Sequence, residues 1–200
     1  MADKSAQEHI FDIHDRCVNL AWGAALYSTF ILTKCNLIEL QEAFVHPPKI
    51  MAMPDTKGQK WIRSAFGSEV YEAMNRDYVY LGCSDMGKSV QAVLTNHEDA
   101  ILQVCGSPFR AVNVRAWETK HEARDFGPSA WDQDGLAPGH LKLMIYLEGL
   151  GGDIGSLELV DLGFIVGPKG LAVIFQNSVI THRAIPARSG GTRPVIEITL

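Results

Sequence analysis

The spacing of apolar residues changes near residue 106, and this change predicts two regions of different structure. Before it, apolar residues recur every three or four positions, which is typical of helices that bury one face. Helices are predicted over 5–33, from 36 to the prolines at 47 and 48, and over 68–76, 88–95 and 97–105. Asn36 and Glu39 have the spacing of a capping box at the start of the second helix, and the prolines end it. The segment 49–67 is expected to be a surface connection or a loop that covers a substrate.

After residue 106 the chain consists of short apolar runs separated by glycine-rich turns. Strands are predicted over 109–117, 141–147, 157–160, 171–175, 180–184 and 195–200. Helices followed by many short strands are typical of an all-β barrel or jelly roll braced by helices. We therefore expect one domain over residues 1–200, mainly β with N-terminal helices (α+β). Residues 1–106 would be a mostly helical bracing region, and 107–200 a jelly-roll core of the cupin-like type.

Composition narrows the class of protein. The hydrophobic content of 46% and charged content of 20% are ordinary for a globular protein. The net charge is -5 and the basic residues are scattered, which argues against a nucleic-acid partner. The four cysteines form no Cys-x-x-Cys pair, which favours free thiols in a cytoplasmic protein. No secretory signal is recognised, and the apolar stretch 17–33 is short for a membrane span, so we expect no membrane partner.

Three residues of the second region have the types and order of a metal site. Asp132 and Asp134 are two positions apart, so on an extended strand both side chains point to the same face. A jelly roll brings distant strands together, and His182 is expected to reach the same ion. Three protein ligands would leave coordination positions open for a co-substrate and oxygen.

A basic residue follows His182 on a neighbouring predicted strand. Arg193 lies on a predicted strand beside the one that carries His182. Its planar guanidinium is suited to pair with the far carboxylate of a dicarboxylate. Arg183 and Arg188 are alternatives, but the spacing from His182 favours Arg193.

Residues 96–200, about half of the chain, resemble the phytanoyl-CoA dioxygenase-like branch of the Fe(II)/2-oxoglutarate-dependent oxygenases. The resemblance is carried by SPFRAVNVRAWETK, SAWDQDG, HLKLMIYLEGL, GSLELV and GLAVIFQNSVITHRAIPARSGGTRPVIEITL. It implies a double-stranded β-helix, the cofactors Fe(II) and 2-oxoglutarate, and oxidation of a small organic substrate. Asp134 matches the family's metal-binding aspartate, His182 its distal histidine and Arg193 its co-substrate arginine.

The chain departs from that family at Asp132, which stands in the place of the proximal histidine. Two carboxylates cancel the charge of a divalent ion before a dianionic co-substrate arrives. The co-substrate is therefore expected to bind more weakly than at a site with a neutral histidine in place of Asp132. An oxygen-rich ligand set also favours harder ions such as Mn or Mg.

Three alternatives follow from this departure. Asp132 ligates iron in an Asp-Asp-His triad, which we rank first. Alternatively, the fold binds a small molecule or a partner without oxidation, or carries out a metal-dependent isomerase, cyclase or lyase reaction. In the third alternative, His140 or His121 supplies the missing ligand. If the fold only binds, the apolar first helix is a candidate interface of a homo-oligomer.

Overall fold

The computed structural model describes residues 27–45, 85–119, 129–134, 139–187 and 193–200. The first part of the helix predicted over 5–33, up to residue 26, lies outside these residues, as do the predicted helix over 68–76 and the loop over 49–67. The described part contains two antiparallel sheets and three α-helices, which agrees with the predicted mainly-β fold.

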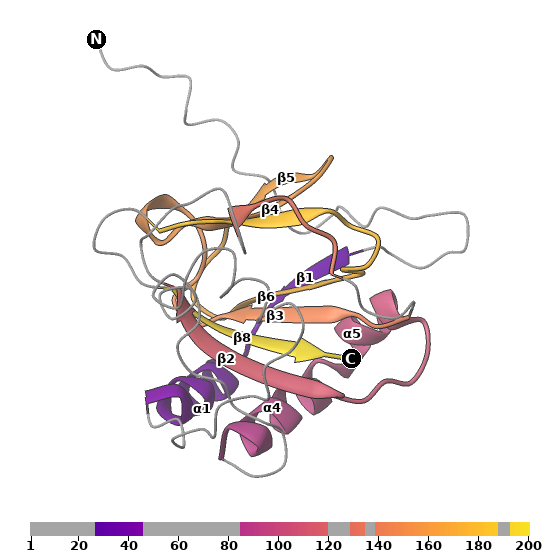
Figure 1. The fold of residues 1–200 in the computed structure, drawn as a ribbon. Coiled ribbons are helices and arrows are strands. Elements are labelled where there is room, and N and C mark those ends of the chain that lie inside the picture. Colours follow the sequence, from indigo (N-terminus) through magenta and orange to yellow (C-terminus); the bar gives the residue numbers. More distant parts are fainter. Residues whose placement is uncertain (1–26, 46–84, 120–128, 135–138, 188–192) are drawn as a thin grey trace, which may run out of the picture.

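The larger sheet has five strands in the order β1-β6-β3-β8-β2. Their bounds are β1 (Tyr27–Ile31), β2 (Asn113–Thr119), β3 (Lys142–Tyr146), β6 (Leu171–Phe175) and β8 (Arg193–Thr199). The smaller sheet has the order β5-β4-β7. It consists of β4 (Ser156–Leu159), β5 (Gly163–Ile165) and β7 (His182–Ile185), and a 3-10 helix, η3 (Gly152–Ile154), precedes β4. The two sheets form separate layers in Figure 1.

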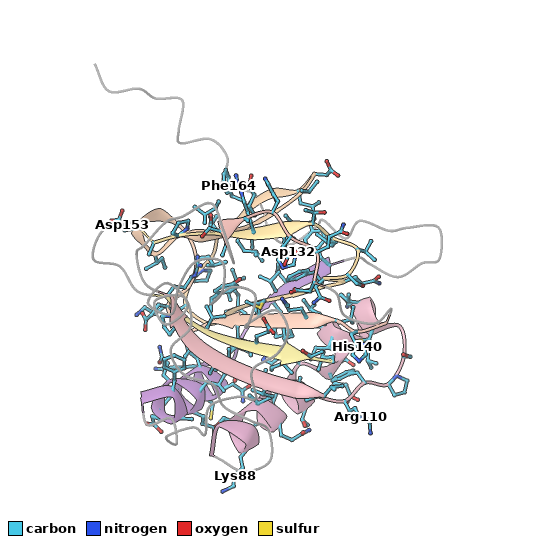
Figure 2. The ribbon with its side chains drawn as sticks, in the orientation of Figure 1. Lys88, Arg110, Asp132, His140, Asp153 and Phe164 are labelled. Atoms are coloured by element: carbon cyan, nitrogen blue, oxygen red, sulfur yellow. The ribbon has the colours of Figure 1, made fainter. Side chains whose placement is uncertain are left out.

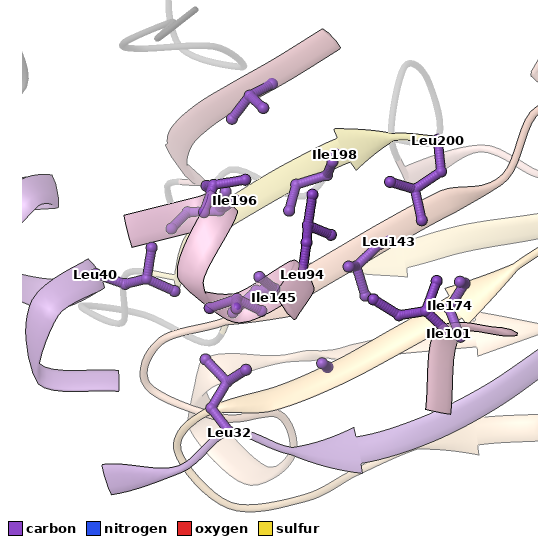
Figure 3. Packing of buried hydrophobic residues seen from close by; sticks show 14 of the residues in the cluster. Leu32, Leu40, Leu94, Ile101, Leu143, Ile145, Ile174, Ile196, Ile198 and Leu200 are labelled. Carbon is purple, nitrogen blue, oxygen red and sulfur yellow. The ribbon is translucent and has the colours of Figure 1, made fainter. Parts of the chain in front are cut away.

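The helices cover the face of the larger sheet that points away from the smaller one (Figure 1). They are α1 (Lys34–Val45), α4 (Asp85–Asn96) and α5 (Glu98–Cys105). Leu40, Leu94 and Ile101 from the helices belong to one apolar cluster with Ile145 and Ile196 of the sheet (Figure 3). None of these helices, nor any other within the described ranges, has the length and apolar character to cross a bilayer.

A second apolar cluster fills the space between the two sheets. It combines Val173 and Val195 of the larger sheet with Leu157 and Leu159 of the smaller one. Because side chains alternate along a strand, every second residue of the central strands points into this space. On β3 and β8 these inward positions include three charged residues, Lys142, Arg193 and Glu197, and all three are buried. The interior between the sheets is therefore partly polar, and the candidate site lies there.

The predictions for the middle and end of the chain are largely confirmed. The helices over 88–95 and 97–105 correspond to α4 and α5, and Gly106 ends α5 in the left-handed conformation that favours glycine. The strand over 171–175 matches β6, and the strand over 141–147 contains β3. The strands predicted over 109–117, 157–160, 180–184 and 195–200 overlap β2, β4, β7 and β8, with ends shifted by a few residues.

Two predictions near the first helices are wrong, and one strand was missed. Residues 27–31 form the edge strand β1, not the end of a helix, because an aromatic and β-branched run pairs with β6. Thr33, not Asn36, caps α1, since the Thr33 hydroxyl accepts the Asn36 N–H at 3.2 Å. The three-residue strand β5 was not predicted, because Gly163 opens it within a turn-rich segment.

Candidate functional site

The acidic pair is attached to β7 through the main chain. Asp132 N–H donates to the His182 carbonyl, and His182 N–H donates to the Asp132 carbonyl, both at 2.9 Å. This reciprocal pair is an isolated antiparallel bridge, in which the two opposed side chains point to the same face. The Gln133 amide anchors the segment further, since it donates to the Val179 carbonyl at 3.0 Å and the Thr181 hydroxyl at 2.8 Å. Asp132 itself is exposed.

Asp134 is the best-connected carboxylate of the site. Its main-chain N–H donates to the Asn177 carbonyl at 3.2 Å, and the Asn177 amide donates to Oδ2 at 3.1 Å. The same oxygen forms an ion pair with Lys142 and lies 3.4 Å from His182 Nε2. Burial raises the pKa of Asp134, but the interactions with His182 and Lys142 outweigh it and hold the pKa below its usual range. Asp134 is therefore anionic in the folded protein.

His182 presents one ring nitrogen to Asp134. Its Nδ1 lies 3.1 Å from the Ile180 carbonyl, which can only accept, so Nδ1 carries a proton. In the neutral ring Nε2 is then an acceptor, and it faces the Asp134 carboxylate, which also only accepts. Two acceptors at 3.4 Å need a proton or a cation between them. The ring of Phe175 meets the imidazole edge-on at a centroid distance of 5.0 Å and limits its rotation.

Lys142 forms a charged cluster with Asp134 and Glu197 and contacts both carboxylates. Its side chain is 8% exposed, and its ammonium contacts Asp134 and lies 3.4 Å from Glu197 Oε2. Sequence reasoning did not single out Lys142, Glu197 or Asn177. The available signal for the two charged residues was a charge within an otherwise apolar stretch of strand, Lys142 in KLMIY and Glu197 in VIEIT.

Arg193 lies at the start of β8 and is 3% exposed. Nη1 donates to the Ile185 carbonyl at 2.7 Å and to the Ser156 carbonyl at 3.2 Å. Nε is buried and has no hydrogen-bond partner. Burial lowers the pKa of Arg193, while the interaction with Tyr146 raises it, and a guanidinium remains charged in proteins. Within the described residues no carboxylate forms an ion pair with this cation.

The alternative arginine is already paired. Arg183 Nε donates to Glu158 Oε2 at 2.6 Å, and its guanidinium lies 4.4 Å from the ring centroid of Trp131. Arg188 and His121 lie outside the described residues. His140 lies just before β3, and Figure 2 shows it apart from Asp132.

The donor set fits a divalent ion in part. Two ligands about 2.1 Å from an ion lie about 3.4 Å apart in tetrahedral geometry and about 3.0 Å apart as neighbours in octahedral geometry, and Asp134 Oδ2 and His182 Nε2 are 3.4 Å apart. The facing acceptors of this pair suit a cation. Within the described ranges, however, no three His, Cys, Asp or Glu side chains form a group that could hold a metal ion. The structure thus brings Asp134 and His182 together, and it pairs Asp132 with His182 through the backbone only.

The comparisons with known proteins concern the fold. No protein-family model matches the chain, and no curated protein sequence matches it. Solved structures with a similar fold include EvdMO1, with a TM-score of 0.58 at 14% identity, over 89% of this chain and 47% of that one. The chain therefore spans about half the length of EvdMO1.

Two further solved structures have a similar fold. The non-haem α-ketoglutarate-dependent epimerase SnoN from nogalamycin biosynthesis matches with a TM-score of 0.57 and 14% identity, over 87% of this chain and 77% of its own. HygX from Streptomyces hygroscopicus, solved with nickel, 2-oxoglutarate and hygromycin B, matches with a TM-score of 0.56 and 10% identity, over 87% and 82%. The chain shares its fold with non-haem 2-oxoglutarate-dependent enzymes.

Proposed function

We propose that the protein binds Fe(II) and 2-oxoglutarate and oxidises a small organic substrate. In this proposal Asp132, Asp134 and His182 hold the metal, and Arg193 binds the far carboxylate of 2-oxoglutarate. The observation that carries it is the buried Arg193 guanidinium, which has an unpartnered Nε and no anionic partner among the described residues. A buried cation of this kind requires a compensating anion, and a dicarboxylate supplies one.

The strand order supports a jelly-roll core for this site. Strands β2, β3, β6 and β8 lie in the larger sheet, whereas β4, β5 and β7 lie in the smaller one, and the isolated bridge at Asp132 joins β7 at His182. The chain thus passes repeatedly between two facing antiparallel sheets. The resemblance of residues 96–200 to the phytanoyl-CoA dioxygenase-like branch supports the same architecture and the same roles for Asp134, His182 and Arg193.

The protein's own residues have distinct tasks in this proposal. Asn177 holds Asp134 at two points: its side-chain amide donates to the carboxylate Oδ2, and its main-chain carbonyl accepts the Asp134 main-chain N–H. The Ile180 carbonyl fixes the tautomer of His182 so that Nε2 faces Asp134. Bound iron and 2-oxoglutarate would supply the oxidising chemistry. The apolar residues between the sheets exclude water from the interior, which strengthens the electrostatic contacts of Arg193.

Turnover of the co-substrate tests the proposal. We expect purified protein supplied with Fe(II), 2-oxoglutarate, oxygen and ascorbate to form succinate, and a panel of small substrates to increase the rate. Asp134→Ala should abolish succinate formation, because it removes the carboxylate that faces His182. Arg183→Met is the control, since the Arg183 side chain is already paired with Glu158 within the smaller sheet. Absence of succinate over the whole panel would reject the oxidative function.

A second function is favoured by the contact between Lys142 and Asp134. An ammonium on the central carboxylate provides the charge that a metal would otherwise provide, which suits a protein that binds a small molecule without oxidation. A metal-dependent isomerase, cyclase or lyase is the related enzymatic alternative. Product formed without oxygen would favour the enzymatic alternative. A cytoplasmic location, a possible homo-oligomer and the absence of a nucleic-acid partner remain predictions from the sequence.

A further inference from the structure

We propose that Lys142 competes with divalent metal ions for Asp134 and thereby sets the metal affinity of the site. This inference rests on the proposed function, because it concerns the same ligands. It goes beyond that function because Lys142 is not itself a metal ligand. In this inference Lys142 controls how tightly the site binds a metal ion.

The contacts place the ammonium on the oxygen that a metal would use. Asp134 Oδ2 is the atom that faces His182 Nε2, and it is also the atom that Lys142 contacts. Asn177 already donates to the same oxygen. A metal ion bound between Asp134 and His182 must therefore take the place of the lysine, because an ammonium and a divalent cation cannot share one lone-pair region at close range.

The structure provides a second partner for the displaced ammonium. Glu197 Oε2 lies 3.4 Å from Lys142 Nζ, and its side chain is 4% exposed. Lys142 and Glu197 project from the adjacent strands β3 and β8 into the same interior space. Lys142 can therefore leave Asp134 without becoming an unpaired buried charge, which would be strongly unfavourable.

The charges of the cluster predict the direction of the effect. The Lys142 ammonium contacts Asp134 Oδ2 and lies 3.4 Å from Glu197 Oε2, so its positive charge stands at the position where a metal ion would bind Asp134. A divalent ion that enters beside Lys142 meets a positive charge within a poorly hydrated interior, where repulsion is screened weakly. Removal of the lysine charge should therefore tighten metal binding, although the ligands themselves are unchanged.

A titration with Mn²⁺ alone tests this inference without any activity measurement. Free Mn²⁺ is counted by electron paramagnetic resonance during titration of wild-type protein and of Lys142→Met. We expect the variant to bind Mn²⁺ roughly tenfold more tightly or better. Lys169→Met is the matched control, because it removes a lysine from an exposed ion pair with Glu148 and should leave the affinity unchanged.

A second pair of variants guards against misfolding. Lys142→Met takes the lysine away from Glu197, which can destabilise the fold. Lys142→Met is therefore also made in protein that carries Glu197→Gln. The double variant should bind Mn²⁺ roughly tenfold more tightly than Glu197→Gln alone. Equal or weaker binding after loss of the lysine, with measurable binding by wild type, overturns the inference and leaves the proposed function standing. If wild type, Lys142→Met and the double variant all fail to bind Mn²⁺, both proposals are rejected.

Discussion

Replacement of Arg193 by Met should weaken 2-oxoglutarate binding far more than the same replacement at Arg183. Arg193 is 3% exposed, and its Nε has no partner, so a carboxylate that reaches it forms a buried, charge-assisted contact. Loss of one partner from a contact of this kind costs about 2–5 kcal/mol. Nη1 already serves two carbonyls, which leaves only part of the guanidinium for the ligand, so we take the lower half of that range. About 2–3 kcal/mol corresponds to a dissociation constant raised roughly 30- to 150-fold.

The assay is calorimetric titration of 2-oxoglutarate into Mn²⁺-loaded protein. Arg183→Met is the control because Arg183 is paired with Glu158 and should change the dissociation constant by no more than about twofold. Circular dichroism of each variant checks folding, since Arg193→Met also leaves the Ser156 and Ile185 carbonyls without a donor. A larger loss of affinity in Arg183→Met than in Arg193→Met would refute the assignment of the co-substrate arginine.

Two further predictions concern stability. Because the folded-state pKa of Asp134 lies below its usual range, this carboxylate contributes stability above the unfolded pKa that is lost on acidification. The urea-unfolding free energy of wild type should therefore fall as pH drops below about 4, and less so for Asp134→Asn; parallel pH profiles would contradict this. Gly155→Ala should destabilise the protein by about 3 kcal/mol or more, because a Cβ there would lie 2.3 Å from the Ile185 carbonyl oxygen at φ +79°. Gly163→Ala, at φ +80° with nothing within 4 Å, should cost only about 1–2 kcal/mol, and equal losses of thermal stability would rule out the steric argument.

Most of the strands could be predicted from the sequence because they show one of two patterns. Either the residues on both faces of the strand are apolar, or apolar and polar residues alternate along it. The run at Leu171–Phe175 is buried on both faces, against the helices and against the smaller sheet, and so reads as an uninterrupted apolar segment. The edge strand β1 was missed because its pairing with β6 joins residues far apart in sequence. A local pattern of apolar spacing contains no information on such long-range pairing.

The candidate site could be predicted only in part, for a similar reason. The order of Asp134, His182 and Arg193 along the chain is visible in the sequence, but the side chains that compensate or compete for their charges are not. Lys142 reaches Asp134 only because β3 lies between β6 and β8 in the sheet. The arrangement of Asn177 around Asp134 depends likewise on a main-chain contact between a turn and a distant segment.

The central claim is that His182 and the acidic pair hold a metal ion beside 2-oxoglutarate bound at Arg193. The most direct measurement is visible absorption of Fe(II)-loaded protein titrated with 2-oxoglutarate in the absence of oxygen. A new charge-transfer band should appear in the wild-type spectrum and be lost in His182→Ala, because chelation requires iron at this site. A wild-type spectrum that stays unchanged at saturating Fe(II) and 2-oxoglutarate, or a band that persists in His182→Ala, would contradict the claim.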